Sequence, residues 1–215
     1  MSDVLGDDLA SIGSGPFVAP ALSRQQAAAI AEGCAGFPPA ALKILKDQPA
    51  PPRPPSVVHH VIANHDTLLD AMPGERKLPI GEQPIERVAD ELMRYAQNMP
   101  PGACWIGGGE PSVELPQNPG RGGRNQHLAL LMAQRLAGLP FEFVALGSDG
   151  TDGPTDAAGA YVNGDSWDKL KAWGDPQRAL HTFDAYPLLD AANLLIRTGP
   201  TGLNLLDLHL LRHKP

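Results

Sequence analysis

Several patterns that mark large protein classes are scarce in this sequence or missing from it. Its two cysteines, Cys34 and Cys104, lie far apart with no paired spacing, which predicts idle thiols in a reducing cytoplasm rather than a disulfide framework. No apolar run approaches the roughly 20 residues that a membrane span needs. The acidic, polar start at residues 1–8 differs from a signal peptide. We therefore expect a soluble, cytoplasmic protein with no membrane partner.

Positive charge is also scarce. The formal net charge is −7, and the only local basic cluster is Arg121 with Arg124. A nucleic-acid groove needs clustered Lys and Arg to neutralise phosphates, so we expect no nucleic-acid partner. Aromatic residues make up only 5% of the chain, whereas there are 23 Gly and 23 Pro. This balance favours an α/β chain with long, shaped loops over a helical bundle.

Capping residues and hydrophobic periodicity predict the elements. Ser23 is a typical N-cap and Gly33 a typical stop, and residues 48–55 hold five prolines, which predicts an extended polyproline-like connector. The predicted helices cover residues 23–33, 38–47, 86–97, 125–137, 166–173 and 175–182, and the predicted strands cover 57–63, 103–106, 141–146, 194–197 and 205–211. Because helix and strand alternate, the expected fold class is α/β, with a mixed or largely parallel sheet and flanking helices.

Glycine-rich polar loops border three of these strands, at residues 107–110, 147–156 and 198–202. Ligands of open α/β sheets bind beyond the carboxyl ends of strands. A further glycine loop, residues 120–125, runs into the most regular helix with Arg121 and Arg124 at its mouth. A guanidinium presents a planar fork to phosphate or carboxylate oxygens, and a helix N-terminus adds partial positive charge. The alternative is that the glycines only make turns and the arginines are solvated, but the combination of loops favours an anion site.

The acidic loop leaves two interpretations open. Asp149, Asp152 and Asp156 do not have EF-hand spacing, yet a single one of them would suffice for Mg²⁺ that also binds substrate phosphates. Alternatively, they hold their own loop through Asx-turn hydrogen bonds. The sequence lacks a P-loop, and a third glycine is missing where a dinucleotide fingerprint needs it. His127 is expected to be a packing or surface residue.

Four motifs in order resemble those of the type II glycerate kinases, whose C-terminal module is called MOFRL. Residues 122–126 (GGRNQ), opening a leucine-rich helix, are similar to its leading motif, residues 148–160 to its second and residues 198–204 to its third. Residues 107–110 stand where the family has a serine, two glycines and a glutamate, so Gly107 replaces a usual serine. Residues 2–8 and 14–16 resemble the end of the family's N-terminal region.

The resemblance implies a domain organisation and an activity. Residues 1–56 would be a remnant of the N-terminal glycerate kinase domain with its linker, and residues 57–215 an α/β domain whose MOFRL-like module begins at about 103. Such enzymes transfer the γ-phosphoryl group of ATP to the 2-hydroxyl of D-glycerate with Mg²⁺. Their essential lysine lies in the N-terminal domain and maps to no residue here. The chain alone is therefore expected to be inactive, with a separate N-terminal half or a second copy as its protein partner.

The implied site has Arg124 as the catalytic group. The implied substrate- and phosphate-binding residues are Gly108, Gly109, Glu110, Arg121, Gly122, Gly123, Asn125, Gln126, Thr198, Gly199 and Thr201, with Asp149, Asp152 and Asp156 as Mg²⁺ candidates. Two other functions stay open. One is hydroxypyruvate reductase, a name often attached to this family, and the other is a non-catalytic MOFRL-like module that binds an anion or a partner chain.

Overall fold

The computed structural model describes residues 1–47, 49, 55–76 and 81–215, which fall into two units. One unit is Gly6–His60, and the other combines Met1–Leu5 with Val61–Pro215. The elements of the first unit are η1 (Ile12–Ser14), α1 (Arg24–Gly33) and α2 (Pro39–Asp47). Those of the second are α3 (His65–Asp70), β1 (Glu75–Arg76), α4 (Ile85–Asn98), β2 (Cys104–Gly109), α5 (Arg124–Arg135), β3 (Phe141–Gly147), β4 (Gly159–Asn163), α6 (Ser166–Lys171), α7 (Pro176–Thr182), α8 (Ala185–Ala191), β5 (Leu195–Ile196) and β6 (Asp207–His213).

The smaller unit contains, besides η1, the two helices that the sequence predicts. Ser23 caps α1 in a capping box, because its hydroxyl accepts from the Gln26 amide and the Gln26 side chain accepts from the Ser23 amide. The apolar area that these helices bury is small. Only Ala28 and Ala31 are buried in α1, and no residue is buried in α2.

The larger unit is built on a sheet with the strand order β1-β2-β6-β3-β4-β5. The pairings from β2 to β5 are all antiparallel, and only the two-residue β1 pairs in parallel with β2. The sheet is therefore mixed, but the expectation of a largely parallel sheet is wrong. The last strand, β6, inserts between β2 and β3 and runs opposite to both, which alternation along the chain does not reveal.

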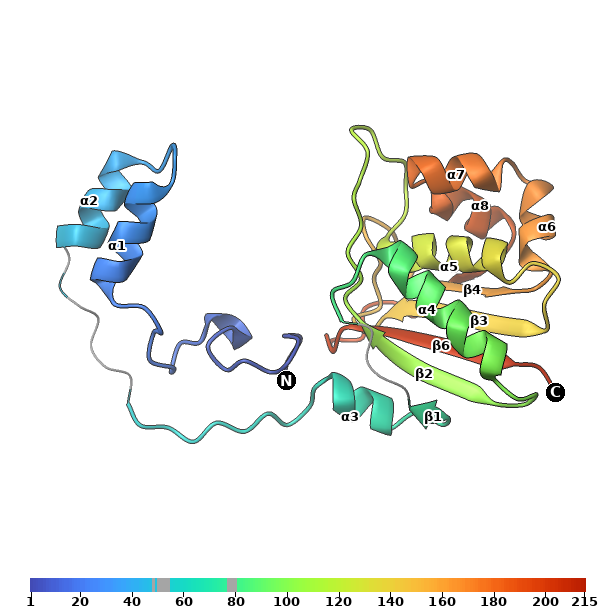
Figure 1. Cartoon of the computed structure of the whole chain (residues 1–215), viewed down its shortest axis with the longest axis horizontal. Helices are drawn as coiled ribbons and strands as arrows, with labels where there is room; N and C mark the ends of the chain where they lie inside the picture. The colour runs from blue at the N-terminus through green and yellow to red at the C-terminus, as the bar shows by residue number, and fades with distance from the viewer. Residues whose placement is uncertain (48, 50–54, 77–80) are drawn as a thin grey trace. The chain divides into compact units, whose positions relative to one another are not determined.

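Helices cover the two faces of this sheet unequally (Figure 1). The main core lies between one face and α4, α5, α7 and α8, and it includes Trp105, Phe143 and Leu211. A small second cluster on the other face joins Leu69 of α3 to Ile106 and Leu208. Alternate residues of β3 are buried on the main face, as expected for a strand whose side chains point to opposite faces.

The predicted strand at residues 57–63 is wrong. These residues adopt no regular structure, and the side chains of Val58 and Ile62 are 82% and 79% exposed. Their β-branched composition favours an extended backbone, but a strand persists only when it pairs with a neighbour. Most of the predicted proline connector, residues 48–55, lies outside the described residues.

Short elements were the ones that sequence patterns missed. The structure adds α3, β1, β4 and α8, each of seven residues or fewer. The first two fall in the segment 64–85, where the four residues 77–80 are not described. Throughout the described ranges, every helix is too short or too polar to cross a membrane.

Candidate functional site

The loops predicted to carry chemistry meet at one edge of the sheet. Because β6 runs opposite to its neighbours β2 and β3, the carboxyl ends of those two strands lie beside the amino end of β6. The N-terminus of α5 reaches the same edge, since Arg124 contacts residues of both β6 and the segment after β2. A cavity of about 460 Å³ opens there and is lined by residues from all of these segments.

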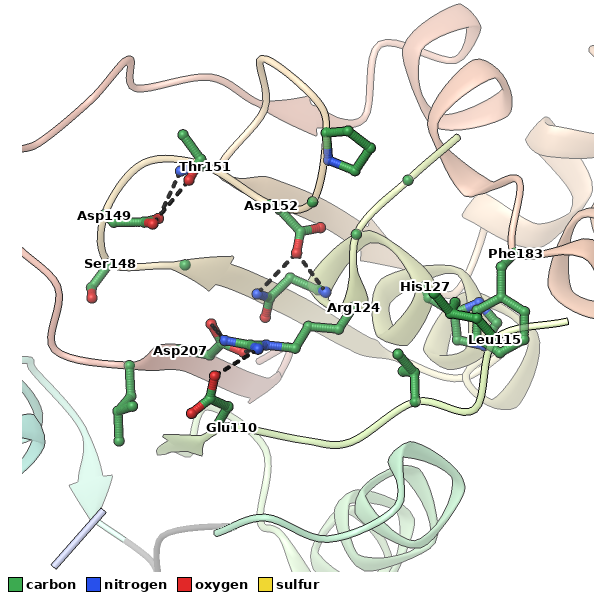
Figure 2. Close-up of a pocket in the computed structure, with 18 of the residues that line it drawn as sticks. Glu110, Leu115, Arg124, His127, Ser148, Asp149, Thr151, Asp152, Phe183 and Asp207 are labelled. Carbon is green, nitrogen blue, oxygen red and sulfur yellow. Dashed lines mark hydrogen bonds and ion pairs between the residues drawn. The ribbon is translucent and has the colours of Figure 1, made fainter. Parts of the chain in front are cut away.

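Arg124, the first residue of α5, is held by two carboxylates. Its Nε and Nη2 atoms donate to Asp207 at 2.5 and 3.1 Å, and its Nη1 atom donates to Glu110 at 2.9 Å (Figure 2). Burial alone would lower the pKa of Arg124, but the hydrogen bonds and charges of Asp207 and Glu110 outweigh it and raise the pKa above its ordinary value. The guanidinium therefore stays charged and has a fixed orientation in the cavity.

Asp207 is the principal site residue that sequence reasoning missed. It opens β6, its side chain is 3% exposed, and burial raises its pKa although the bonds from Arg124 oppose that shift. A methyl group at Gly108 of the neighbouring strand would lie 1.9 Å from the Asp207 carbonyl oxygen, so this close approach requires glycine. The available signal was an acidic residue within the mostly apolar run of residues 205–211, because an acidic side chain is rarely buried without a partner.

The start of α5 is capped from a distant loop. Both carboxylate oxygens of Asp152 accept hydrogen bonds from backbone amides, one from Asn125 with an N···O distance of 3.0 Å and one from Gln126 with an N···O distance of 2.8 Å. These two amides are therefore not free for an anion, although the helix N-terminus was part of the anion site expected from the sequence. Gly123 allows the arrangement, because a methyl group there would lie 2.3 Å from the Asp152 carboxyl carbon. Burial raises the pKa of Asp152 to about 6, although the two amide hydrogen bonds oppose the shift.

Asp149 lines the cavity and also holds its own loop. Its carboxylate accepts from the Thr151 amide at 2.8 Å and from the Thr151 hydroxyl at 2.9 Å, which is the Asx-turn arrangement. The loop after β5 packs on this turn, because the Thr201 amide donates to the Asp149 carbonyl and the Thr201 hydroxyl to the Ser148 carbonyl. Gly199 lies against Gly150, so Thr198, Gly199 and Thr201 brace the acidic loop from outside the cavity lining.

The second arginine of the glycine loop points elsewhere. Arg121 is exposed and lies over the ring of Tyr186, 3.9 Å from its centre. The Tyr186 hydroxyl donates to Asp156, which also forms an ion pair with Arg197. Arg121 and Asp156 thus belong to a surface network and do not line the cavity.

The predicted residues divide accordingly. Glu110, Gly122, Gly123, Arg124, Asn125, Asp149 and Asp152 line the cavity, whereas Gly108, Gly109, Arg121, Gln126, Asp156, Thr198, Gly199 and Thr201 lie outside its lining. Several residues outside the lining serve the site indirectly. Gln126, for example, donates to the Asp152 carbonyl and to Thr155, which fixes the acidic loop on α5.

Part of the cavity wall is apolar. Val113, Leu115, Pro119 and Phe183 contribute to it, and Phe183 stacks on His127 with ring centres 4.0 Å apart. Burial lowers the pKa of His127 to about 4, so its ring is neutral at pH 7. This agrees with the expected packing role.

The carboxylates of the cavity could hold a metal ion only together with the oxygens of a bound phosphate ligand and water. Over the ranges that the structure describes, no three His, Cys, Asp or Glu side chains are grouped closely enough to hold a metal. Asp152 binds the start of α5, Asp207 binds Arg124 and Asp156 binds Arg197. Of the other lining carboxylates, Glu110 and Asp149 follow the carboxyl ends of β2 and β3, and Asp3 belongs to the N-terminal segment. Mg²⁺ commonly takes one or two protein carboxylates together with phosphates and water, and Glu110 and Asp149 meet that requirement.

The fold and the site together define an α/β protein with a charged, loop-built pocket at one edge of its sheet. Residues 103–207 match the MOFRL family, and residues 1–46 match a domain of unknown function, DUF4147. The chain is 34% identical to the D-glycerate 2-kinase of Thermotoga maritima over 97% of its own length and 54% of that protein. It is 36% identical to the glycerate 2-kinase of Pyrococcus horikoshii over 56% of its length and 28% of that protein.

Solved structures agree with this assignment. The crystal structure of glycerate kinase from Thermotoga maritima superposes with a TM-score of 0.85 at 33% identity, over 99% of this chain and 55% of that one. The chain belongs to the MOFRL family and corresponds to the C-terminal region of glycerate 2-kinases, with a DUF4147 segment before it, which confirms the resemblance inferred from the motifs. It spans about half the length of the Thermotoga relative.

Proposed function

We propose that this chain carries the phosphate-binding part of an ATP-dependent glycerate 2-kinase, which transfers the γ-phosphoryl group to the 2-hydroxyl of D-glycerate. The observation that carries the proposal is the Arg124 guanidinium, fixed at the meeting point of the β2, β3 and β6 segments and lining the cavity. Homology to glycerate kinases supports the proposed reaction and substrate class.

The two carboxylates that hold Arg124 have different roles in this mechanism. Asp207 is buried and binds two nitrogens of the guanidinium, so it sets the plane of the fork. Glu110 is 45% exposed and binds one nitrogen. Exposed ion pairs contribute only about 0–1 kcal/mol, so a phosphate oxygen can replace the Glu110 carboxylate on Nη1. The orientation set by Asp207 then directs Arg124 at the charge that spreads over the transferred group.

Glu110 and Asp149 are the residues that would hold Mg²⁺ in this site. When bound, Mg²⁺ neutralises phosphate charge and orients the phosphates for in-line transfer. Glu110, once released from Arg124, has both oxygens available for such an ion. Asp149 is positioned by its bonds to Thr151.

The charge balance of the cavity supports a further cation from outside these residues. The lining contains five carboxylates, those of Asp3, Glu110, Asp149, Asp152 and Asp207, against the single guanidinium of Arg124. Phosphoryl transfer depends on positive charge around the phosphates, and Arg124 is already paired. We propose that the N-terminal half of the family enzyme completes the site, on a separate chain or on a longer form of this one, in line with the lysine that the resemblance implies.

The test is a coupled assay of ATP-dependent phosphorylation of D-glycerate. It uses the chain alone and the chain mixed with the N-terminal half of the Thermotoga maritima enzyme, with NADH and hydroxypyruvate as a second substrate pair. We expect little or no turnover by the chain alone, and Mg²⁺-dependent turnover with ATP and D-glycerate after mixing. Rapid phosphorylation by the purified chain would contradict the proposed need for a second half. Oxidation of NADH would instead favour the reductase alternative.

A further inference from the structure

The cavity has two chemically different ends. Figure 2 shows Ser148, Asp149 and Thr151 on one side, Leu115, His127 and Phe183 on the other, and Arg124 between them. The first side offers hydroxyl and carboxylate oxygens, whereas the second offers hydrocarbon and aromatic surface. The second side does not bind phosphates, because phosphate oxygens need hydrogen-bond donors and positive charge.

The cavity is also larger than the reacting groups require. Its volume of about 460 Å³ lies in the range of pockets that enclose drug-sized ligands. A three-carbon acid and a terminal phosphate group would occupy the surroundings of Arg124 and leave the apolar end empty. A nucleotide carries a flat aromatic base, whose two faces can stack on apolar and aromatic surfaces, at the far end from its γ-phosphate.

Backbone strain points to the same end. Phe183 has a φ of 53°, in the left-handed region that bulky residues rarely adopt and where a helix C-terminus ordinarily has glycine. Such conformations cluster at ligand sites, where the surrounding structure offsets their cost. At Phe183 the left-handed turn after α7 places the ring on His127 and in the cavity wall.

We propose that the apolar wall formed by Val113, Leu115, Pro119, His127 and Phe183 binds the base of the nucleotide whose phosphates lie at Arg124. This inference rests on the proposed function, since it assumes that the polar end binds phosphates. Phe183 is partly exposed although it stacks on His127, so it presents aromatic surface to the cavity. Aromatic side chains bind bases by stacking with little regard to which base is present. Because the side chains of Val113, Leu115 and Pro119 are hydrocarbon and His127 is covered by the ring of Phe183, the wall selects for a planar ring rather than for adenine alone.

The experiment separates the base from the phosphates. Isothermal titration calorimetry measures the binding of Mg²⁺-ATP, Mg²⁺-GTP and Mg²⁺-tripolyphosphate to the wild-type chain and to Phe183→Gly. Glycine adopts the left-handed conformation freely, so this variant removes the ring and keeps the turn. Asn193→Gly is the matched control, because Asn193 has a φ of 57° and lies outside the cavity lining. Leu115→Ala is a second wall variant at a side chain that is 60% exposed and therefore tolerates truncation.

The expected result is that both nucleotides bind wild type about tenfold more tightly than tripolyphosphate, the factor typical of stacking on one aromatic side chain. Phe183→Gly should abolish that preference and leave tripolyphosphate binding unchanged. Leu115→Ala should reduce the preference, and Asn193→Gly should keep it. Equal binding of ATP and tripolyphosphate by wild type, or a preference that survives in Phe183→Gly, would overturn the base site and leave the phosphate site standing. If no ligand bound wild type even after the N-terminal half of the Thermotoga maritima enzyme was added, the phosphate site itself, and with it the proposed function, would fail.

Discussion

At the scale of single residues, Arg124 and Arg121 are neighbours in sequence with different surroundings. Arg124 is fixed by Asp207 and Glu110 in the cavity, whereas Arg121 lies on Tyr186 at the surface. We expect Arg124→Lys to lower kcat by two or more orders of magnitude in the reconstituted enzyme, since an ammonium cannot reproduce the two-point contact with Asp207 while it faces a phosphate. Arg121→Lys should change kcat by less than about threefold. Steady-state kinetics of both variants, with ATP and D-glycerate each varied, is the measurement. Near-wild-type kcat for Arg124→Lys would mean that the glycine loop is a turn and no more.

A second residue-scale prediction concerns His209 in β6. Its side chain is fully buried, neither ring nitrogen has a hydrogen-bond partner among the described residues, and burial, with His65 and Arg124 nearby, lowers its pKa to about 3. The pKa in the folded state is thus below the unfolded value of about 6.5. The contribution of neutral His209 to the free energy of unfolding is therefore fully present above pH 6.5. It is lost as the pH falls toward 3, because the unfolded chain binds a proton that the folded protein does not bind. Between pH 7 and pH 5 the loss should be about 2 kcal/mol.

Urea unfolding of wild type and His209→Leu at several pH values tests this directly. The variant should lose about 2 kcal/mol less than wild type between pH 7 and pH 5, because leucine has no proton to bind. Asp152 acts in the opposite direction, since its pKa is raised to about 6 and protonation relieves a buried charge, but it is present in both proteins. Parallel stability curves for the two proteins would show that His209 titrates normally.

At the scale of elements, the start of α5 depends on a side chain from another part of the chain. Asp152 satisfies the amides of Asn125 and Gln126 that no residue before the helix satisfies. We expect Asp152→Ala to lower the free energy of unfolding by roughly 1–2 kcal/mol at pH 8, where the carboxylate is charged. Asp165→Ala is the matched control, because Asp165 precedes α6 without a capping bond from its side chain, and it should cost less than about 0.5 kcal/mol. Equal effects of both changes in urea titrations would argue against the cap.

The same elements show what the sequence could reveal. Local signals found α4, α5 and β3 and placed the glycine loops at strand ends, because periodicity and capping are local properties. The cap from Asp152 and the bonds from Asp207 are long-range contacts, whose partners are 27 and 83 positions apart in the sequence, so no local pattern predicts them. The antiparallel position of β6 between β2 and β3 was not predicted, for the same reason. Arg121 and Arg124 were predicted together, because their place in a glycine loop before a helix is a local feature, and of the two only Arg124 lines the cavity.

At the scale of the whole molecule, the two units have different means of stabilisation. The larger unit has a continuous core between its sheet and helices, with Trp105, Phe143 and Leu92 fully buried. The smaller unit, Gly6–His60, buries two alanines in α1 and leaves Ile30 and Ile44 57% and 54% exposed. Ordering the backbone costs roughly 1–2 kcal/mol per residue, and apolar burial is the main term that offsets it. We propose that the domain boundary expected after residue 56 is also a boundary in stability.

Hydrogen exchange followed by mass spectrometry tests this boundary in the chain as it exists. Amides in α1 and α2 should exchange at least about a hundredfold faster than those in α5, because local opening of a helix pair with few buried contacts needs far less free energy than unfolding of the main core. The helical hydrogen bonds are present in both places, so a difference in rate reports packing rather than secondary structure. Mixing with the N-terminal half of the Thermotoga maritima enzyme provides the second arm. If that half covers the exposed Ile30 and Ile44, exchange in α1 and α2 should slow while exchange in α5 stays the same. Exchange in α1 and α2 as slow as in α5 for the chain alone would show that the smaller unit is stable without further cover.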